Sequence, residues 1–141
     1  MLQKFFVRKI LSPLNTAIYR LSRGRLLGRM SGLPVLLLVT SGRRSGKART
    51  APLLYTEDGD AFVVIASFGG QPEHPAWYLN LEANPSATVQ VGGEEYAVRA
   101  ETVEGDERER LWNQMTQGYA SYDDYEKKTT RKIPVVALRR A

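Results

Sequence analysis

The sequence has no cysteine and a single histidine, His74, among its 141 residues. The lack of thiols excludes disulfides, thiolate metal sites and cysteine nucleophiles, and it is compatible with a reducing cytosol. One histidine excludes a multi-histidine metal centre, and the acidic residues do not cluster as ligands do, so we expect no metal site. His74 has no evident partner in the sequence, which favours a place at the start of a helix over a role as acid or base.

The chain also lacks a long apolar run. The apolar segment 33–39 is far too short to cross a bilayer, which takes about twenty residues. Pro13 and Asn15 interrupt the stretch that a secretory signal needs. With 43% hydrophobic and 25% charged residues, the composition is that of one soluble domain. We therefore expect a cytoplasmic protein.

Acidic residues are missing from the first part of the chain. Residues 1–56 carry eleven Lys or Arg and no Asp or Glu, whereas the remainder carries nine bases and fifteen acids. This division predicts a negatively charged partner that meets one side of the protein. An anionic cofactor, an anionic membrane surface and nucleic acid all fit the charge. We expect no nucleic acid, because no stacking aromatic residues are interleaved with the arginines.

Apolar residues recur at helical spacing through a basic N-terminal segment, residues 1–31. Ser12 and Pro13 divide it into expected helices at about 2–11 and 13–23. A basic amphipathic helix of this kind either lies on an anionic membrane or packs on its own domain. The sequence leaves both open, and the first alternative implies peripheral contact with the inner face of the cell membrane.

Residues 32–141 are expected to form a single domain of strands and helices. Strands are predicted at 34–40, 50–57, 61–67, 87–91, 95–101 and 133–138, of which the first three are consecutive and antiparallel. Helices are predicted at 76–83 and from 105 to about 117. About six mostly antiparallel strands with inserted helices fit a small α+β barrel better than a doubly wound sheet.

The turn between the first two strands, residues 42–49, is rich in cations and is called the basic turn below. It holds three arginines, one lysine and two glycines. Arginine forks and a lysine charge suit phosphate or carboxylate oxygens, and glycines allow backbone N–H groups to approach an anion. A P-loop has four residues between its glycines and Ser or Thr after its Lys. Here three residues intervene and Ala48 follows Lys47, so a nucleotide triphosphatase is excluded, while a solvated charged hairpin is the alternative.

Two further segments are candidates for chemistry. Residues 67–75 combine a strand end, a glycine pair and a helix start, where backbone N–H groups can face a ligand. Tyr119, Tyr122 and Tyr125 share one face if they lie on a helix. Their hydroxyls favour a polar-lined pocket, and a packing stripe is the alternative.

In their order along the chain, these segments resemble the deazaflavin-dependent nitroreductase family, whose members are also described as deazaflavin-dependent quinone reductases of actinobacteria. The similarity runs from about residue 20 to the C-terminus. It rests on LLLVTSGRRSGKARTAPL (36–53), ASFGG (66–70), HPAWYLNL (74–81), ANP (83–85), YASYDDY (119–125) and RKIPV (131–135). The resemblance implies a split β-barrel of the flavin-reductase type. It also implies the coenzyme F-420, an anionic 8-hydroxy-5-deazaflavin with a phosphate and an oligoglutamate tail, with FMN as the second choice.

The resemblance assigns roles to residues by motif. Residues that would hold the phosphate and tail are Arg43, Arg44, Ser45, Gly46, Lys47 and Arg49. Residues that would lie along the deazaflavin, or behind it, are Pro52, Ala66, Ser67, Phe68, Trp77 and Asn80, with Phe68 at a position where many members have Lys. Residues that would line the substrate side are Leu54, Tyr119, Tyr122 and Tyr125, with Ser67 nearby.

The implied reaction is hydride transfer from the reduced deazaflavin to a quinone, a nitroaromatic compound or an enone. The coenzyme carries this chemistry, and the protein supplies position and electrostatics. The proton would come from a tyrosine, Tyr122 before Tyr119 and Tyr125, or from water, and Ser67 completes the expected catalytic group. Membrane contact would favour a lipophilic quinone. The alternative is a non-catalytic carrier of FMN, haem or a fatty acid in the same barrel.

Overall fold

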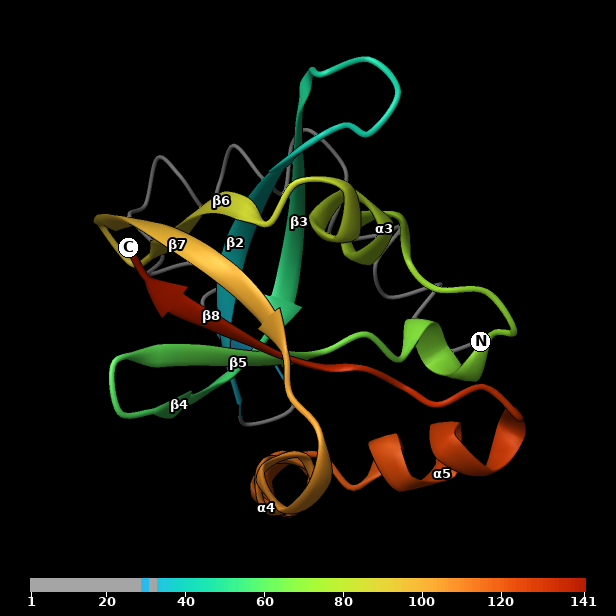
Figure 1. Ribbon diagram of the computed structural model, residues 1–141. Helices are drawn as coiled ribbons and strands as arrows, with labels where there is room; N and C mark the ends of the chain where they lie inside the picture. The colour runs from blue at the N-terminus through green and yellow to red at the C-terminus, as the bar shows by residue number, and fades with distance from the viewer. Residues whose placement is uncertain (1–28, 31–32) are drawn as a thin grey trace.

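The computed structural model describes residues 29–30 and 33–141, which form a strongly curled antiparallel sheet with helices around it (Figure 1). The strands of this described part are β1 (Arg29–Met30), β2 (Leu33–Ser41), β3 (Ala48–Leu54), β4 (Thr56–Asp58), β5 (Ala61–Ile65), β6 (Ser86–Val91), β7 (Glu94–Thr102) and β8 (Val135–Arg140). The helices are the 3₁₀ turn η1 (Phe68–Gly70), α3 (Ala76–Ala83), α4 (Gly105–Gly118) and α5 (Ser121–Lys128). The helices expected at 2–11 and 13–23 lie outside the described residues, as does nearly all of the segment 1–31.

The sheet closes on itself through one continuous stretch of chain. Its strand order is β1-β2-β6-β7-β8-β5-β4, and β3 pairs with β2. β3 runs directly into β4 through Tyr55, so the chain connects β2's partner near one end of this order to β4 at the other end. Every pair of neighbouring strands is antiparallel. The result is a barrel, as the sequence predicted.

Three predicted strands differ from the observed ones by two residues or more. The strand expected at 61–67 ends at Ile65, as β5. The strand expected at 50–57 is two strands, because β3 pairs with β2 up to Leu54 and β4 pairs with β5 from Thr56. Between them the Tyr55 N–H donates to the Pro34 carbonyl at 3.2 Å, which marks the bend. The last strand begins at Val135 rather than at residue 133, since Pro134 has no N–H to give to a ladder.

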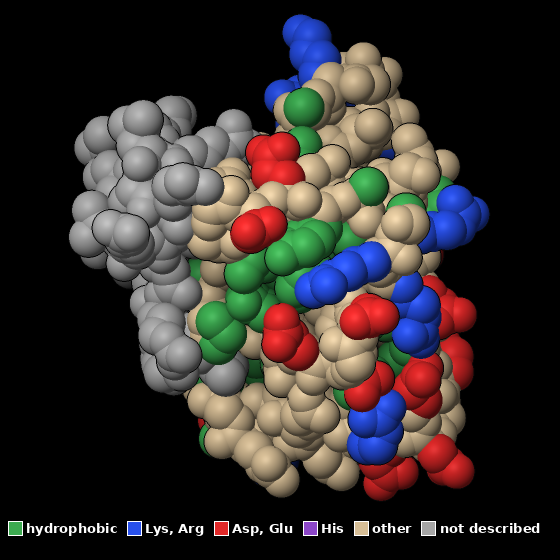
Figure 2. Space-filling model, turned by 90° about the vertical axis from the view of Figure 1, so that its left-hand side faces the viewer, with side chains coloured by type: hydrophobic (Ala, Val, Ile, Leu, Met, Phe, Trp, Pro, Cys, Tyr) green, Lys and Arg blue, Asp and Glu red, His purple; other side chains and the backbone are tan. Residues whose placement is uncertain are grey.

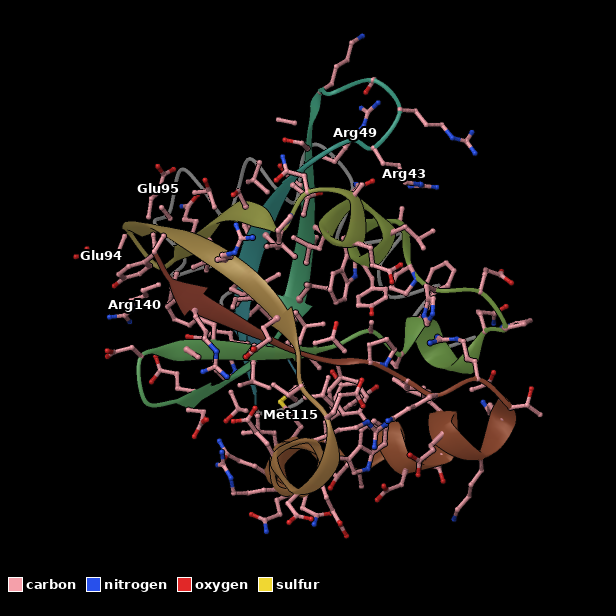
Figure 3. All side chains as sticks on the ribbon, in the orientation of Figure 1. Arg43, Arg49, Glu94, Glu95, Met115 and Arg140 are labelled. Carbon is pink, nitrogen blue, oxygen red and sulfur yellow. The ribbon has the colours of Figure 1, made fainter. Side chains whose placement is uncertain are left out.

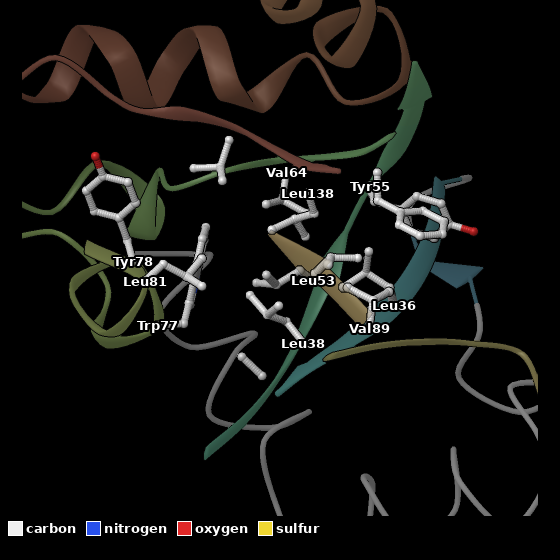
Figure 4. Close-up of a cluster of buried hydrophobic side chains, with 14 of the residues drawn as sticks. Leu36, Leu38, Leu53, Tyr55, Val64, Trp77, Tyr78, Leu81, Val89 and Leu138 are labelled. Carbon is white, nitrogen blue, oxygen red and sulfur yellow. The ribbon is translucent and has the colours of Figure 1, made fainter. Parts of the chain in front are cut away.

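The two larger clusters of the core lie one on each side of β5. Alternate residues of β5 point inward and outward, yet all five are buried. Phe62 and Val64 face the inside of the barrel, where Leu36, Leu38 and other apolar side chains fill the space (Figure 4). The alternate residues of β5 pack on the outer side against α4 and α5, in a cluster called the outer cluster below. Burying each large apolar side chain contributes roughly 1.5–3 kcal/mol.

The helices cover the barrel at different places (Figure 1). In α4 and α5 acidic residues occupy the first turn, and α5 ends on two lysines, as the helix dipole favours. Pro75 stands at the N-cap of α3, which spans the residues predicted for it. No helix in the described part of the chain combines the length and apolar character that a membrane span requires.

One end of the barrel is covered by a cation. The guanidinium carbon of Arg140 lies 4.4 Å from the ring centroid of Tyr96 and 5.1 Å from that of Phe62. On this face, hydrophobic side chains gather in the middle with charged side chains around them (Figure 2). Stacking of this kind is favourable by about 0.5–1 kcal/mol at an exposed site.

Candidate functional site

The site is a cavity of about 410 Å³ between the β2–β3 hairpin, the start of α3 and the turn η1, called the hairpin cavity below. Figure 3 shows Arg43 and Arg49 on the hairpin above α3. The residues that line the cavity are Gly42, Arg43, Arg44, Ser45, Arg49, Thr50, Ala51, Phe68, Pro75, Ala76, Trp77 and Asn80. Residues up to 38 positions apart in the sequence, Gly42 and Asn80, therefore meet at one concave surface.

The lining of the hairpin cavity divides by chemistry. Arg43, Arg44 and Arg49 supply positive charge from the hairpin side, whereas Phe68 and Trp77 supply aromatic surface from the other side. Guanidinium groups bind phosphate and carboxylate oxygens, often with two parallel hydrogen bonds. Aromatic walls with a few placed polar groups are typical of sites for planar ligands. The cavity thus suits a planar ring that carries an anionic group at one end.

The basic turn has its shape because of its two glycines. The Gly42 N–H donates to the Lys47 carbonyl at 2.8 Å, and the Gly46 N–H donates to the Gly42 carbonyl at 2.8 Å. Gly46 has a φ of 72°, in the left-handed region that favours glycine. A Cβ on Gly42 would lie 3.2 Å from the Lys47 carbonyl oxygen. Because these two N–H groups bond within the turn, the glycines shape the turn and do not donate to an anion themselves.

Asn80 connects the basic turn to α3. It is 3% exposed, and its Oδ1 accepts hydrogen bonds from the Arg43 backbone N–H at 3.1 Å and from the Arg43 guanidinium at 3.2 Å. Its amide nitrogen donates to the Thr40 hydroxyl at 3.1 Å. A buried amide with these three bonds holds Arg43 at the edge of the cavity.

The cavity unites seven of the residues assigned to the coenzyme and leaves others out. Arg43, Arg44, Ser45, Arg49, Phe68, Trp77 and Asn80 line it. Among the described residues, those assigned to the coenzyme that do not line it are Gly46, Lys47, Pro52, Ala66 and Ser67. Ala66 and Ser67 are fully buried. Five lining residues were not predicted from the sequence: Gly42, Thr50, Ala51, Pro75 and Ala76. They lie next to the assigned motifs in the sequence, which is the one feature that could have identified them.

The three tyrosines lie elsewhere. Tyr122 and Tyr125 are 2% and 1% exposed within the outer cluster, where Tyr119 packs against them. The hydroxyls of Tyr119 and Tyr125 are 3.0 Å apart, and burial raises the pKa of the Tyr122 and Tyr125 hydroxyls. Figure 3 shows Met115, another member of the outer cluster, on the opposite side of the barrel from Arg43.

The structure does not bring these tyrosines to the hairpin cavity, whose lining in the described chain includes none of them. Leu54, the fourth residue assigned to the substrate side, packs against Val35 and Leu37 instead. Of the two alternatives that the sequence left open, the packing stripe describes where Tyr122 and Tyr125 lie. The substrate-side roles of the four residues stay predictions.

His74 has a partner that the sequence did not reveal. Its Nδ1 lies 3.0 Å from a guanidinium nitrogen of Arg131. Because a guanidinium only donates, Nδ1 accepts, and the ring is neutral with its proton on Nε2. Burial, together with the charge of Arg131, lowers the pKa of His74. His74 directly precedes Pro75 and α3, as expected for a residue at a helix start.

Comparison with known proteins gives the same fold and a family. A family model described as F420H(2)-dependent quinone reductase matches residues 11–140. An F420H(2)-dependent quinone reductase of Mycobacterium tuberculosis is 42% identical over 131 residues, which are 90% of this chain and 88% of that relative. A putative F420H(2)-dependent quinone reductase of the same organism is 45% identical over 107 residues, 76% of this chain and 90% of the relative.

Comparison with solved structures supports the same fold and family. The structure of an F420-H2 dependent reductase covers 75% of this chain with a TM-score of 0.70 and 40% identity, over 94% of that protein. A heme binding protein from Mycobacterium smegmatis has a TM-score of 0.61 at 20% identity, over 84% of this chain and 50% of that protein, and this likeness shows the fold alone. The split barrel predicted from the sequence is confirmed.

Proposed function

The chain belongs to the F420H(2)-dependent quinone reductase family, and on this premise we propose that it transfers a hydride from the reduced deazaflavin coenzyme F-420 to a quinone. The observation that carries the proposal is the hairpin cavity, in which a cationic side and an aromatic side meet. A coenzyme with a planar ring and an anionic tail requires both.

The residues present fit this coenzyme. Arg44, Arg49 and the Arg43 side chain held by Asn80 would bind the phosphate, because each places a charged donor at the cationic side of the cavity. Trp77 and Phe68 would border the ring. When bound, the coenzyme supplies the hydride, and the protein supplies its position and the surrounding charge.

The protein contributes positioning of the coenzyme ring. Trp77 is 8% exposed and Tyr78 behind it is 7% exposed, so the wall at the start of α3 is supported from within the barrel. Their rings meet edge to face at 6.3 Å. A wall that cannot shift keeps a ring in one orientation, and orientation is a large part of what an enzyme adds to a two-substrate reaction.

For the proton that accompanies the hydride, we propose water. The sequence left a tyrosine and water open as sources. Tyr122 and Tyr125 are almost fully buried in the outer cluster, and their raised pKa disfavours the loss of a proton. The burial of Tyr122 and Tyr125 therefore supports water as the proton source, and a tyrosine donor stays a prediction from the resemblance.

The family name favours a quinone over the nitroaromatic and enone acceptors, which stay predictions. A lipophilic quinone and peripheral membrane contact rest on the N-terminal segment, which lies outside the described residues. The carrier alternative is not favoured, since the likeness to a heme binding protein extends to the fold alone.

The experiment is a titration of the purified protein with reduced coenzyme F-420, followed by addition of menadione. We expect binding below tens of micromolar and oxidation of the coenzyme that depends on both protein and quinone. Parallel titrations with FMN and haem test the carrier alternative. Absence of coenzyme binding at tens of micromolar would refute the proposal, and tight haem or FMN binding without turnover would favour a carrier.

A further inference from the structure

Arg131 ties together a loop that follows β5, although it comes from the other end of the domain. Its Nε donates to the Gln71 carbonyl at 3.0 Å. Its two terminal nitrogens donate to the carbonyls of Ala66, at 3.2 Å, and Ser67, at 2.7 Å. One of them also reaches Nδ1 of His74 at 3.0 Å. A single guanidinium thus engages four residues of the segment 66–74, called the clamped loop below.

The clamped loop contains a backbone conformation that needs support. Phe68, Gly69 and Gly70 have φ values of 48°, 63° and 79°, three left-handed residues in succession. Glycine adopts this region freely, but a phenylalanine does so only where its surroundings enforce it. Phe68 is also a wall of the hairpin cavity. The strained residue is therefore the one that would meet the ligand.

A second restraint acts on the same loop from α5. A Cβ built on Gly70 would lie 2.9 Å from the Tyr125 carbonyl oxygen and 3.1 Å from Cβ of Lys128, so the loop backbone lies directly against this helix. Within the loop, the Gly70 N–H donates to the Ser67 carbonyl at 2.9 Å and the Gln71 N–H donates to the Phe68 carbonyl at 3.1 Å. The loop is thus restrained by contact with α5 on one side and by Arg131 on another.

Resting on the proposed function, we infer that Arg131 is a positioning residue for the coenzyme. In the described structure it does not line the hairpin cavity. Its guanidinium holds the carbonyls on both sides of Phe68 and, through His74, the segment that leads into α3 and Trp77. Arg131 therefore sets the distance between the two aromatic walls of the cavity.

The chemistry requires arginine at this position. A guanidinium presents five N–H donors in one rigid plane, which matches three carbonyls and an imidazole that surround it. A lysine keeps the charge but concentrates its donors on one nitrogen, so it cannot span the same acceptors. Lys132 provides a matched control, because it is the next residue and forms an exposed ion pair with Glu104 at 2.6 Å.

The test compares Arg131→Lys and Arg131→Ala with Lys132→Ala and with the unaltered protein. Two quantities are measured: the dissociation constant of oxidised coenzyme F-420 by fluorescence, and amide hydrogen exchange at residues 67–71 without coenzyme. We expect Arg131→Lys to raise the dissociation constant at least tenfold and to speed exchange at the Gly70 and Gln71 amides. Lys132→Ala should change neither by more than twofold. Millimolar guanidinium ion should restore part of the affinity of Arg131→Ala, and methylammonium should not.

Native affinity together with native loop exchange in Arg131→Lys would overturn the inference. So would weaker binding with unchanged loop exchange, or faster exchange throughout the barrel with unchanged affinity, which is the result of a general loss of stability. If Arg131→Ala does not fold, Arg131→Lys alone decides. If the unaltered protein does not bind the coenzyme, the proposed function fails, and the exchange data still decide whether Arg131 holds the loop.

Discussion

Arg44 and Lys47 offer a sharp test of the hairpin cavity, because both are exposed cations on the basic turn but only Arg44 lines the cavity. Replacing each by glutamine removes one positive charge and keeps most of the side-chain stem. The two variants therefore have the same net charge and differ in where the charge is lost. If the cavity binds the phosphate of the coenzyme, Arg44→Gln should weaken binding much more than Lys47→Gln.

The expected magnitudes follow from the two environments. A hydrogen bond to a charged group contributes about 1.5–3 kcal/mol, which corresponds to roughly a 10- to 150-fold loss of affinity. Lys47 acts on the ligand through solvent, where charges are screened over about 8 Å at physiological salt. For Lys47→Gln we therefore expect a loss below about threefold, on the scale of an exposed ion pair.

The assay is the dissociation constant of coenzyme F-420 from fluorescence, at low and at physiological salt. The effect of Arg44→Gln should persist at the higher salt, whereas that of Lys47→Gln should largely disappear. Equal losses in both variants would mean that the net charge of the turn matters and the cavity does not. No loss in either would return the basic turn to the solvated hairpin that the sequence left as the alternative.

Three further outcomes are expected. Gly70→Ala should lower the free energy of unfolding by about 2–4 kcal/mol, since it adds a backbone clash to an unfavourable φ. Gly59 has a φ of 59° but open space around it, so Gly59→Ala should lower the free energy of unfolding by about 1 kcal/mol, with both variants measured by thermal melting. The pKa of His74 is lowered in the folded state, so the unfolded state takes up the proton first and stability should fall as the pH drops below the usual histidine value of 6.5; His74→Gln should flatten urea-derived stability against pH in that range. Asn80→Leu should cost about 2–4 kcal/mol and weaken coenzyme binding, because the Arg43 N–H groups lose their acceptor and the buried Thr40 hydroxyl loses its donor; unchanged stability and affinity would contradict this role.

Much of the fold could be predicted because local signals and tertiary structure agree. The strands β2, β6 and β7 lie within a residue or two of their predicted limits, where apolar runs end at turn residues such as Gly92 and Gly93. Helix α3 spans the predicted residues, since Pro75 suits its start. At these positions the local sequence preference and the structure of the barrel favour the same conformation.

The bend at Tyr55 could not be predicted from the same signals. Residues 50–57 show the continuous pattern of one strand, and only the closure of the barrel makes two partners compete for them. β3 pairs with β2, whereas β4 pairs with β5. Tyr55 lies where the chain changes from one strand partner to the other, so it belongs to neither ladder. This is a tertiary requirement, and side-chain type does not indicate it.

The tyrosine triplet shows a different limit. Spacing placed Tyr119, Tyr122 and Tyr125 together, and the ring centroids of Tyr119 and Tyr122 are indeed 5.0 Å apart. They do not share one helix, because Tyr119 is the C-cap of α4 whereas Tyr122 and Tyr125 lie on α5. Spacing also could not say which side of the barrel these helices cover. We expected a polar-lined pocket because buried phenol hydroxyls need hydrogen-bond partners. The cluster supplies one such partner itself, since the Tyr119 and Tyr125 hydroxyls bond to each other.

Arg131 and Asn80 together explain why the site residues are scattered in sequence yet meet at one cavity. Asn80 binds the basic turn to α3 across 37 residues, and Arg131 binds the clamped loop to the segment before β8 across about 60 residues. Both act on backbone groups, so each fixes the position of a neighbouring side chain, Arg43 in one case and Phe68 in the other. A hydrogen bond to a backbone N–H or carbonyl group requires no particular side chain on the partner, so no pattern of residue types indicates it. A site of this kind can be recognised in a sequence by the side chains that would touch the ligand, while the residues that position them become visible once the chain is folded.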